Sequence, residues 1–343
     1  MVNPLYEMAR TTVAMIDRAT RGTLVVTGAD RRSFLQGLLT NDVQVLQPGR
    51  GCYAAWLTPQ GRMITDMRVV EVSGRMLLDV RAADAAALAQ RLEPLVFAED
   101  VQVQDASSTF DQIRVIGPAA ARTVGRVLTR LSGGRETASE SQLAAWFEYE
   151  NAVIPLQDGE LTVVRDDGFG VAGYDFYVGR TASATVRAAL QEARVTRLDE
   201  ATAEVLRIES GRPLFGVDMD SDTIPLEAGI EDRAISFSKG CYVGQEVIVR
   251  VISRGHGRVA RRLVGLLLDG TQVPAAGDPI VAGGREIGHV TSAVLSAALG
   301  RPIALGYVHR DFAEPGASMT VGNQAATVTQ VPFVRPAPTA GAQ

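Results

Sequence analysis

The sequence predicts a mixed helix-and-strand (α+β) protein of several domains, the last of which is a small β-barrel. The chain is 343 residues long, more than one hydrophobic core ordinarily serves, which predicts two or three domains. Strand-like and helix-like patterns alternate up to about residue 210. From about residue 257, short β-branched and leucine-rich segments alternate with turns and show no helical period, which is typical of a barrel.

The first hundred residues or so are predicted to form a strand-rich unit with two helices. Asp30 stands where a helix N-cap belongs, and Phe34 and Leu38 follow on one helical face. Ser73-Gly74 is predicted to turn a hairpin between two strands. The expected elements are a strand at 22–27, a helix within 28–42, strands at 52–57, 63–72 and 76–80, and a helix over 83–97 that Pro94 interrupts.

A second unit begins near residue 110 and again alternates strands and helices. Pro118 suits the first position of a helix, because the N–H that it lacks is not needed there. Gly211, with Pro213 beyond it, ends the last helix of this part. The expected elements are a strand at 110–117, a helix at 118–131, a polar loop at 132–142, strands across 146–178 with turns at 157–159 and 166–168, and helices at 181–193 and 199–210.

These patterns divide the chain into four stretches. The division is an N-terminal α+β domain at 1–108, a second α+β domain at 109–256, the β-barrel at 257–332 and a flexible, Pro/Ala-rich tail at 333–343.

Charge and composition exclude several classes of function. The net charge of −5 argues against direct nucleic-acid binding by bulk electrostatics. Glu7, Arg10 and Asp17 interrupt the N-terminus, so it lacks the apolar centre of a signal peptide, and no run approaches the roughly 18 apolar residues of a spanning helix. Cys52 and Cys241 are too few for a disulfide framework. We therefore expect a cytoplasmic protein in a reducing compartment, without direct membrane contact.

Metal and hydrolase chemistry are not indicated. His256, His289 and His309 are spread over the predicted barrel and have no metal-ligand spacing with either cysteine, so no metal is expected. No nucleophile-elbow pattern accompanies a Ser-His-Asp order. Residues 255–260, GHGRVA, match a dinucleotide fingerprint in form, but a strand-like run with Gly265 follows where the true site needs a helix.

A cluster of arginines surrounds the start of the predicted barrel. Two interpretations stay open: a charged strand edge that discourages sheet-to-sheet association, or an anion site for a phosphate or a carboxylate chain. The cluster comprises Arg250, Arg254, Arg258, Arg261 and Arg262.

Residues 239–250, KGCYVGQEVIVR, place one of the two cysteines in a cramped and polar setting. An isolated cysteine is most often a small buried apolar residue. Here, however, two glycines permit the close approach of another group, and Lys239 supplies positive charge that would favour the Cys241 thiolate. Gln245 and Glu246 add polar side chains at the start of a predicted strand. The pattern predicts a reactive or ligand-facing loop.

The run K-G-C-Y-x-G-Q-E strongly resembles the signature of the YgfZ family, the folate-binding relatives of the glycine-cleavage T-protein. Three further blocks resemble family blocks in the expected order: SFLQGLLTNDV at 33–43, LTPQGRMITDMRV at 57–69 and LRIESGRPLFGVDMDSDTIPLEAG at 206–229. The resemblance spans residues 23–308. It implies a ring of three domains around a central folate pocket, with antiparallel sheets backed by helices, interleaved first and second domains, and a C-terminal β-barrel.

The resemblance also implies which residues meet tetrahydrofolate. In GRMITDM, Thr65 and Asp66 fall on the acidic pair of the T-protein, so one acid is missing. Asp175, in GYDFYV, falls on the pterin-binding glutamate of that protein, and Arg207 and Glu209 are kept. The further candidates for holding folate are Gln245, Glu246, Arg250, Arg254 and Arg258.

Three functions stay open at this point. The main hypothesis is a folate-binding protein, not a conventional enzyme, that supports iron–sulfur cluster assembly or repair, with Cys241 as its essential thiol beside Lys239. Its partners would be folate and iron–sulfur client or assembly proteins, among them radical-SAM tRNA methylthiolation enzymes. The alternative is a folate-dependent aminomethyl or C1 transferase of the T-protein type. Two residues count against it: Thr65, in place of a family acid, and Ala203, in place of a family arginine. The third is a thiol oxidoreductase, which would need Cys52 as its resolving thiol.

Overall fold

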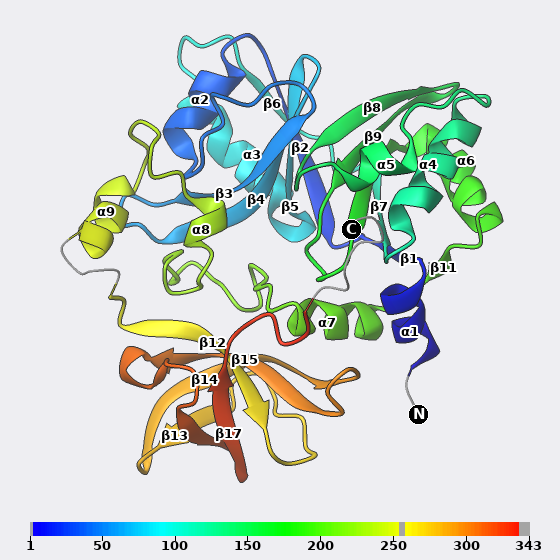
Figure 1. Cartoon of the computed structure of the whole chain (residues 1–343). Helices are drawn as coiled ribbons and strands as arrows, with labels where there is room; N and C mark the ends of the chain where they lie inside the picture. The colour runs from blue at the N-terminus through cyan, green and yellow to red at the C-terminus, as the bar shows by residue number, and fades with distance from the viewer. Residues whose placement is uncertain (1–2, 254–257, 336–343) are drawn as a thin grey trace.

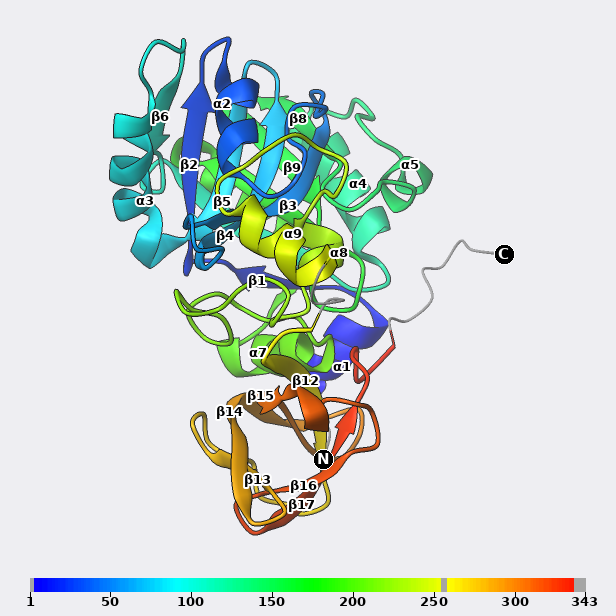
Figure 2. The same cartoon turned by 90° about the vertical axis from the view of Figure 1, so that its left-hand side faces the viewer.

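The computed structural model describes residues 3–253 and 258–335, which form three bodies (Figure 1). Two α+β units stand side by side, the first drawn in blue to cyan and the second mostly in green, and a barrel drawn in yellow to red lies beneath them. The turned view shows the same barrel below both units (Figure 2). Within the described residues, no helix has the length and apolar character needed to cross a membrane. The predicted α+β architecture with antiparallel sheets and a C-terminal barrel is confirmed.

A five-stranded antiparallel sheet forms the first unit. Its strands, in spatial order, are β3 (Arg50–Leu57), β4 (Met63–Val72), β5 (Arg75–Arg81), β2 (Arg21–Thr27) and β6 (Gln102–Asp105). Helices α2 (Arg31–Leu38) and α3 (Ala85–Leu92) cover one face of this sheet with their apolar sides. The 3₁₀ turns η1 (Ala82–Asp84) and η2 (Glu93–Leu95) flank α3, and η2 contains the proline predicted to interrupt the helix.

A six-stranded sheet forms the second unit. Its strands, in spatial order, are β11 (Thr196–Arg197), β1 (Ala14–Asp17), β7 (Phe110–Ile116), β10 (Gly173–Gly179), β9 (Gly159–Arg165) and β8 (Asn151–Leu156). Helices α4 (Ala120–Leu131), α5 (Glu140–Ala144) and α6 (Arg180–Glu192) pack on one face. Helix α4 begins two residues later than predicted. Helix α5 begins inside the predicted polar loop, where Ser139 forms a capping box, and extends two residues beyond it.

The two units interleave along the chain. Helix α1 (Pro4–Thr11) and β1 come first in the sequence, yet β1 pairs with β7 and β11 of the second sheet. The chain then crosses to β2 of the first sheet and returns to the second only at β7. A linear division at residue 108 therefore leaves one strand of the second sheet inside the first stretch.

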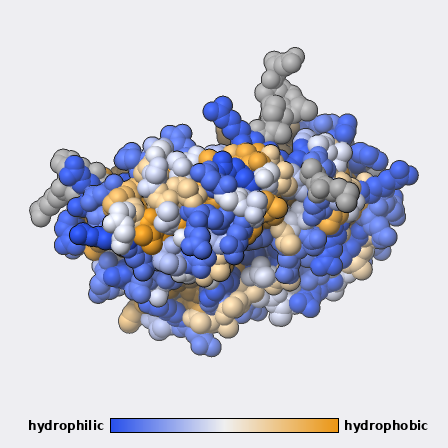
Figure 3. Space-filling model, turned by 90° about the horizontal axis from the view of Figure 1, so that it is seen from below, coloured by the Kyte–Doolittle hydropathy of each residue, from blue (hydrophilic) through white to orange (hydrophobic). Residues whose placement is uncertain are grey.

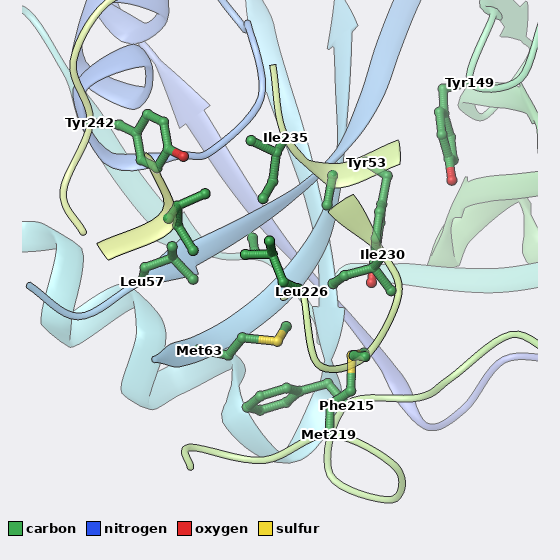
Figure 4. Packing of buried hydrophobic residues seen from close by; sticks show 14 of the residues in the cluster. Tyr53, Leu57, Met63, Tyr149, Phe215, Met219, Leu226, Ile230, Ile235 and Tyr242 are labelled. Carbon is green, nitrogen blue, oxygen red and sulfur yellow. The ribbon is translucent and has the colours of Figure 1, made fainter. Parts of the chain in front are cut away.

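The segment between α7 (Glu200–Glu209) and the barrel packs on the first unit. It carries the short helix α8 (Glu231–Ala234) and helix α9 (Gln245–Ser253), and covers the face of the first sheet opposite α2 and α3. Residues of this segment up to Ile252, expected in the second domain, thus contribute to the core of the first. The predicted strand at Glu246 and beyond is wrong, since these residues are helical. Figure 4 shows Phe215, Met219, Leu226 and Ile230 of this segment near Leu57 and Met63 of the sheet.

The C-terminal body is a closed six-stranded barrel. Its strands, in spatial order, are β12 (Arg261–Leu268), β15 (Arg301–His309), β14 (Arg285–Ser296), β13 (Pro279–Ala282), β16 (Ser318–Val321) and β17 (Gln324–Thr329), with the 3₁₀ turn η3 (Arg310–Phe312) after β15. Helix α7 lies on the barrel, where Ile208 packs against Ile303 and Leu305. Seen from below, hydrophilic residues surround scattered hydrophobic patches (Figure 3).

A buried group of charges, which we name the ion cluster, joins the two sheets. Asp79 of β5 pairs with Arg18, in the link between the sheets (2.8 Å), and with Arg21, the first residue of β2 (2.6 Å). Arg114 of β7 pairs with Asp175 of β10 (2.5 Å). The full cluster consists of Arg18, Arg21, Arg68, Arg114, Asp79, Asp166 and Asp175.

The electrostatics of the ion cluster favour its charged form. Burial alone would raise the pKa of the Asp79 carboxyl, but the guanidinium groups of Arg18 and Arg21 hold it well below its usual range. The pKa of Asp166 is lowered likewise, against the effect of its burial, by Arg114. Asp79 and Asp166 therefore stay ionised at neutral pH, and the cluster ties the two units through largely buried charges.

Replacing Asp79 by asparagine is expected to lower the free energy of unfolding by about 3–5 kcal/mol, because Arg18 and Arg21 would stay buried without a counter-charge. The folded-state pKa of Asp79 lies below the unfolded value of about 3.9, so its stabilising effect is complete above that pH and is lost as the pH falls further. Thermal unfolding by circular dichroism between pH 7 and about pH 2.5 measures both effects. Asp269→Asn, at an exposed pair with Arg301, is the control and should cost about 1 kcal/mol at most. Equal losses in both variants would contradict the prediction.

Candidate functional site

A cavity of about 580 Å³ opens where the two sheets, α7 and residues 212–217 meet. We name residues 212–217 the strap. Seven arginines and five acids line the cavity, so its walls carry an excess of positive charge. The arginines are Arg18, Arg21, Arg68, Arg114, Arg207, Arg212 and Arg233. The size is typical of a small-molecule site, and the charge favours a ligand with an anionic part.

Asp66, on β4, lines this cavity. Of the acids that the sequence predicted to bind folate and that the structure describes, it is the one that has an unpaired oxygen in the cavity. Its Oδ2 accepts a hydrogen bond from the hydroxyl of Tyr53 (2.7 Å), on the neighbouring strand β3. Its Oδ1 is buried and has no partner within the described part of the chain. Burial, and then the charge of Asp66, raise the pKa of the Tyr53 phenol, which therefore stays a hydrogen-bond donor. An unpaired buried acceptor calls for a ligand N–H or O–H.

Thr65, at the position of the missing acid, does not face the cavity. It lies opposite Trp56 in the β3–β4 ladder, and Trp56 packs in the core under α2 and α3. Asp66 lies opposite Ala55, which belongs to the core on the other face of the sheet. Side chains alternate along a strand, so an acid at position 65 would point away from a ligand that Asp66 contacts.

Two guanidinium groups in the cavity have N–H donors that form no hydrogen bond with the described residues. Nη2 of Arg212 pairs with Glu148 (3.2 Å), while its buried Nη1 has no partner among the described residues. Arg233 lies over the ring of Tyr53, with 4.9 Å from its Cζ to the ring centroid, and pairs with no described acid. Burial raises the pKa of Glu148, which weakens its hold on Arg212 at lower pH. These groups suit the anionic part of a ligand.

Aromatic side chains supply flat walls. Tyr53, Tyr149 and Phe169 line the cavity, and the Arg114 guanidinium lies 5.0 Å from the ring centroid of Phe169. Tyr149 adopts φ of +66°, a left-handed conformation that costs a residue with a Cβ about 1–3 kcal/mol. The close-up of the adjoining core shows Tyr149 and Tyr53 rising from different units (Figure 4). A strained backbone that directs an aromatic ring into a cavity is typical of a binding site.

Arg207 lines the cavity but has no hydrogen left for a ligand. A guanidinium offers five N–H donors. Those of Arg207 bind Glu204 twice (2.6 and 2.8 Å), Asp218 (2.7 Å), Ser292 (2.8 Å) and the carbonyl oxygen of Arg212 (2.7 Å). Its side chain therefore builds the wall, and its predicted contact with folate would have to come from its face rather than from its N–H groups.

Asp175 and Glu209 have their oxygens engaged inside the protein. Asp175 accepts both of its hydrogen bonds at 2.5 Å from Arg114. Glu209 accepts from Ser296 and from Tyr6, both at 2.6 Å, at the joint between α7 and the barrel. Neither carboxylate lines the cavity. Their predicted roles toward a folate stay predictions, and the structure gives both residues a part in holding the fold.

Lys239 anchors the signature loop from within. Its Nζ donates to the carbonyl oxygens of Gln36 (2.7 Å), Leu39 (2.6 Å) and Asn41 (3.0 Å), which follow the end of α2. Burial lowers the pKa of Lys239 to about 8. The ammonium group is thus fixed toward α2, and its predicted effect on the Cys241 thiol stays a prediction.

The other signature residues lie apart from the cavity. Cys241 is exposed on the anchored loop. Gln245, Glu246 and Arg250 lie on α9, where they line a separate hollow of about 550 Å³. Arg258 is exposed, and Arg254 lies outside the described residues. The structure therefore places Asp66 and Arg207 at the cavity, engages Asp175 and Glu209 inside the fold, and puts Cys241 and the predicted α9 residues elsewhere.

Several cavity residues were missed by sequence reasoning. Tyr53, Arg68 and Tyr149 belong to strands or turns whose burial could not be assigned without the fold. One feature of the sequence could have identified Arg68 as a cavity residue. It is a charged residue in an apolar strand, and because it follows Asp66 by two positions it faces the same side of the sheet. Such a position demands a buried partner or a ligand.

Comparison with known proteins gives one consistent result. The model of the "GCVT N-terminal domain" matches residues 2–239, and that of the "Glycine cleavage T-protein C-terminal barrel domain" matches residues 261–335. An aminomethyltransferase of Thermosynechococcus vestitus is 31% identical over 334 residues, which cover 96% of this chain and 86% of the relative. One of Rippkaea orientalis is 28% identical over 340 residues, covering 96% and 88%.

A solved structure shares the fold. The glycine cleavage system aminomethyltransferase T of Bartonella henselae superposes with a TM-score of 0.84 at 22% identity, covering 98% of this chain and 91% of that one. These similarities support the T-protein family as a whole and do not single out the YgfZ branch.

The two cysteines are expected to differ sharply in reactivity. Cys241 is exposed, whereas Cys52 is half-buried on β3 and burial raises the pKa of its thiol to about 12. A chromogenic disulfide reagent at about pH 8 should therefore titrate one thiol rapidly in the native protein and the second only after unfolding. Cys241→Ser should abolish the rapid phase and Cys52→Ser should leave it intact. Two equally fast thiols in the native protein would refute the assignment.

Proposed function

This chain belongs to the glycine-cleavage T-protein family, and from that premise we propose that it is a folate-dependent aminomethyl or one-carbon transferase. The observation that carries the proposal is the unpaired Oδ1 of Asp66, buried in a cavity of about 580 Å³ and oriented by the Tyr53 hydroxyl. The names of the relatives support transfer more directly than they support an iron–sulfur role.

The residues of the cavity fit a reduced folate. The molecule has a flat, N–H-rich ring at one end and carboxylates at the other. Asp66 would accept a ring N–H, and the rings of Tyr53 and Tyr149 would flank the flat part. The spare donors of Arg212 and Arg233 would hold carboxylates. One cavity thus meets both ends of the ligand with complementary groups.

Asp66 also suits the chemical step. A bound reduced folate supplies a ring nitrogen that accepts the transferred carbon, and positive charge develops on the nitrogen as the new bond forms. A carboxylate held nearby in a water-poor site stabilises that charge without reorganising. The Tyr53 hydrogen bond fixes the carboxylate and leaves Oδ1 free. The absence of an acid at position 65 does not count against transfer, because Thr65 faces the other side of the sheet.

The second candidate is the folate-binding protein of YgfZ type that supports iron–sulfur cluster assembly or repair. One observation favours it: Cys241 is exposed on a loop that Lys239 pins to the end of α2, so a thiol is presented to solvent on a fixed base. Here Cys241 would contact a client protein or its cluster, and tRNA methylthiolation enzymes would be among the clients. A dithiol oxidoreductase is less well supported, because the buried Cys52 thiol is a poor resolving group.

Asp66→Asn is expected to weaken tetrahydrofolate binding about 10- to 100-fold, because an ionised acceptor is replaced by a neutral amide. Titration calorimetry measures this. Cys241→Ala, outside the cavity, is the matched control and should bind like the wild type. Unchanged binding in Asp66→Asn, or no folate binding by the wild type, would overturn the proposed site.

Turnover separates the two candidates. The wild type is expected to form a methylene-folate product from tetrahydrofolate and an aminomethyl donor, with release of ammonia and of the donor's carrier group in its protonated form. Asp66→Asn should lose at least about 100-fold in kcat, and Cys241→Ala should retain the activity. If folate binds but no product forms, and Cys241→Ala instead abolishes support of tRNA methylthiolation in cells that lack the native protein, the second candidate replaces the first.

A further inference from the structure

We infer that the C-terminal barrel is a working part of the cavity, through two hydroxyl groups that never touch its ligand. Thr291 and Ser292 of β14 act as positioning residues: both fix Asp218, which in turn fixes Arg207 and the strap, and Ser292 also accepts a hydrogen bond from Arg207 directly (2.8 Å). This inference goes beyond the proposed function, since it concerns how any ligand of the cavity is held.

Asp218 is the hub of the arrangement. It is 2% exposed, and its Oδ1 accepts from the hydroxyls of Thr291 (2.6 Å) and Ser292 (2.6 Å). Its Oδ2 accepts from Nη1 of Arg207 (2.7 Å) and from the backbone N–H of Leu214 (3.0 Å). One carboxylate therefore ties the barrel, helix α7 and the strap together, with each oxygen accepting two hydrogen bonds.

An irregularity in β14 makes this contact possible. Neighbouring side chains of a regular strand point to opposite faces, so Thr291 and Ser292 could not both reach one carboxylate. The β14–β15 register shifts between Val290 and Ser292, which face Gly306 and Leu305, so Thr291 is an extra residue in the ladder. Such a bulge redirects side chains and is characteristic of functional positions.

The strap depends on the same hub. Arg207 donates to the carbonyl oxygen of Arg212 (2.7 Å), and Asp218 accepts from the N–H of Leu214, so the backbone is held on both sides of Pro213. Arg212, Leu214 and Val217 line the cavity, and Val217 is 50% exposed. Phe215 of the strap is buried in the core of the first unit, so Arg207 and Asp218 fix the part of the strap that precedes it.

Neither barrel hydroxyl lines the cavity, yet the loss of either leaves Asp218 short of a donor in a dry site. A charge that lacks one of its hydrogen bonds shifts toward its remaining partners, here Arg207 and the strap. The expected result is a strap that opens more often and a ligand that dissociates faster, while the fold persists.

The barrel offers a matched control. Ser296 on the same strand donates to a second buried carboxylate, Glu209 (2.6 Å), with Tyr6 on its other oxygen. The chemistry is the same, but Glu209 does not bond to the strap or line the cavity. Ser296→Ala thus removes an equivalent hydroxyl with an equivalent cost to the fold.

The test measures strap opening and ligand affinity in the full-length protein. Amide hydrogen exchange of residues 212–219 without ligand should accelerate about 10-fold or more in Thr291→Val and in Ser292→Ala, and remain at the wild-type rate in Ser296→Ala. Tetrahydrofolate affinity should fall about 5- to 20-fold in the first two variants only. Thr291→Ser keeps the hydroxyl and should restore both values.

The two proposals fail in different ways. If the wild type binds no tetrahydrofolate, the proposed function fails, and the exchange rates alone decide the coupling. If exchange is unchanged in Thr291→Val and Ser292→Ala, or rises equally in Ser296→Ala, the positioning role is overturned. If exchange accelerates but the affinity of a folate-binding wild type is kept, the barrel holds the strap without serving the ligand, and the inference is likewise overturned.

Discussion

The buried charges between the two sheets are the constraint on which the upper part of the molecule depends. Four guanidinium groups and three carboxylates lie largely buried between the sheets, and each carboxylate contacts at least two arginines. Ions so buried are tolerated only when every partner is in place, so the cluster specifies one mutual orientation of the sheets. Misplacing one strand would leave a charge uncompensated at a cost of several kcal/mol.

The ion cluster also determines what remains for recognition. Arg18, Arg68 and Arg114 lie in the cavity wall, but their charges are committed to Asp79, Asp166 and Asp175. Among the described residues that line the cavity, the Oδ1 of Asp66 and the donors of Arg212 and Arg233 keep spare capacity for a ligand. A cavity wall with many charged side chains therefore makes only a few specific contacts available to a ligand. The fixed distances between these contacts, rather than the total charge of the wall, determine which ligand is selected.

Local patterns predicted the hairpins, most helices of both units and the barrel, because those depend on turns and on alternation, but they missed α1 and α5. They failed at α9, where VIVRVIS is rich in β-branched residues; there Gly244, at φ of +84°, redirects the chain and Ile248 packs into the core. The resemblance brought Asp66 to attention, and Asp66 does line the cavity. It could not reveal that Arg207 and Asp175 are saturated, since their partners come from distant parts of the chain.

The interleaving of the units has a consequence for synthesis on the ribosome. Strand β1 is made almost first, yet its partners β7 and β11 are complete only after residues 116 and 197. The first sheet, in turn, keeps an apolar face uncovered until Phe215 and the residues that follow have left the exit tunnel. At about 5–20 residues per second, these surfaces stay open for many seconds. Nascent chains of this protein therefore make natural clients for chaperones until more than two-thirds of the message has been read.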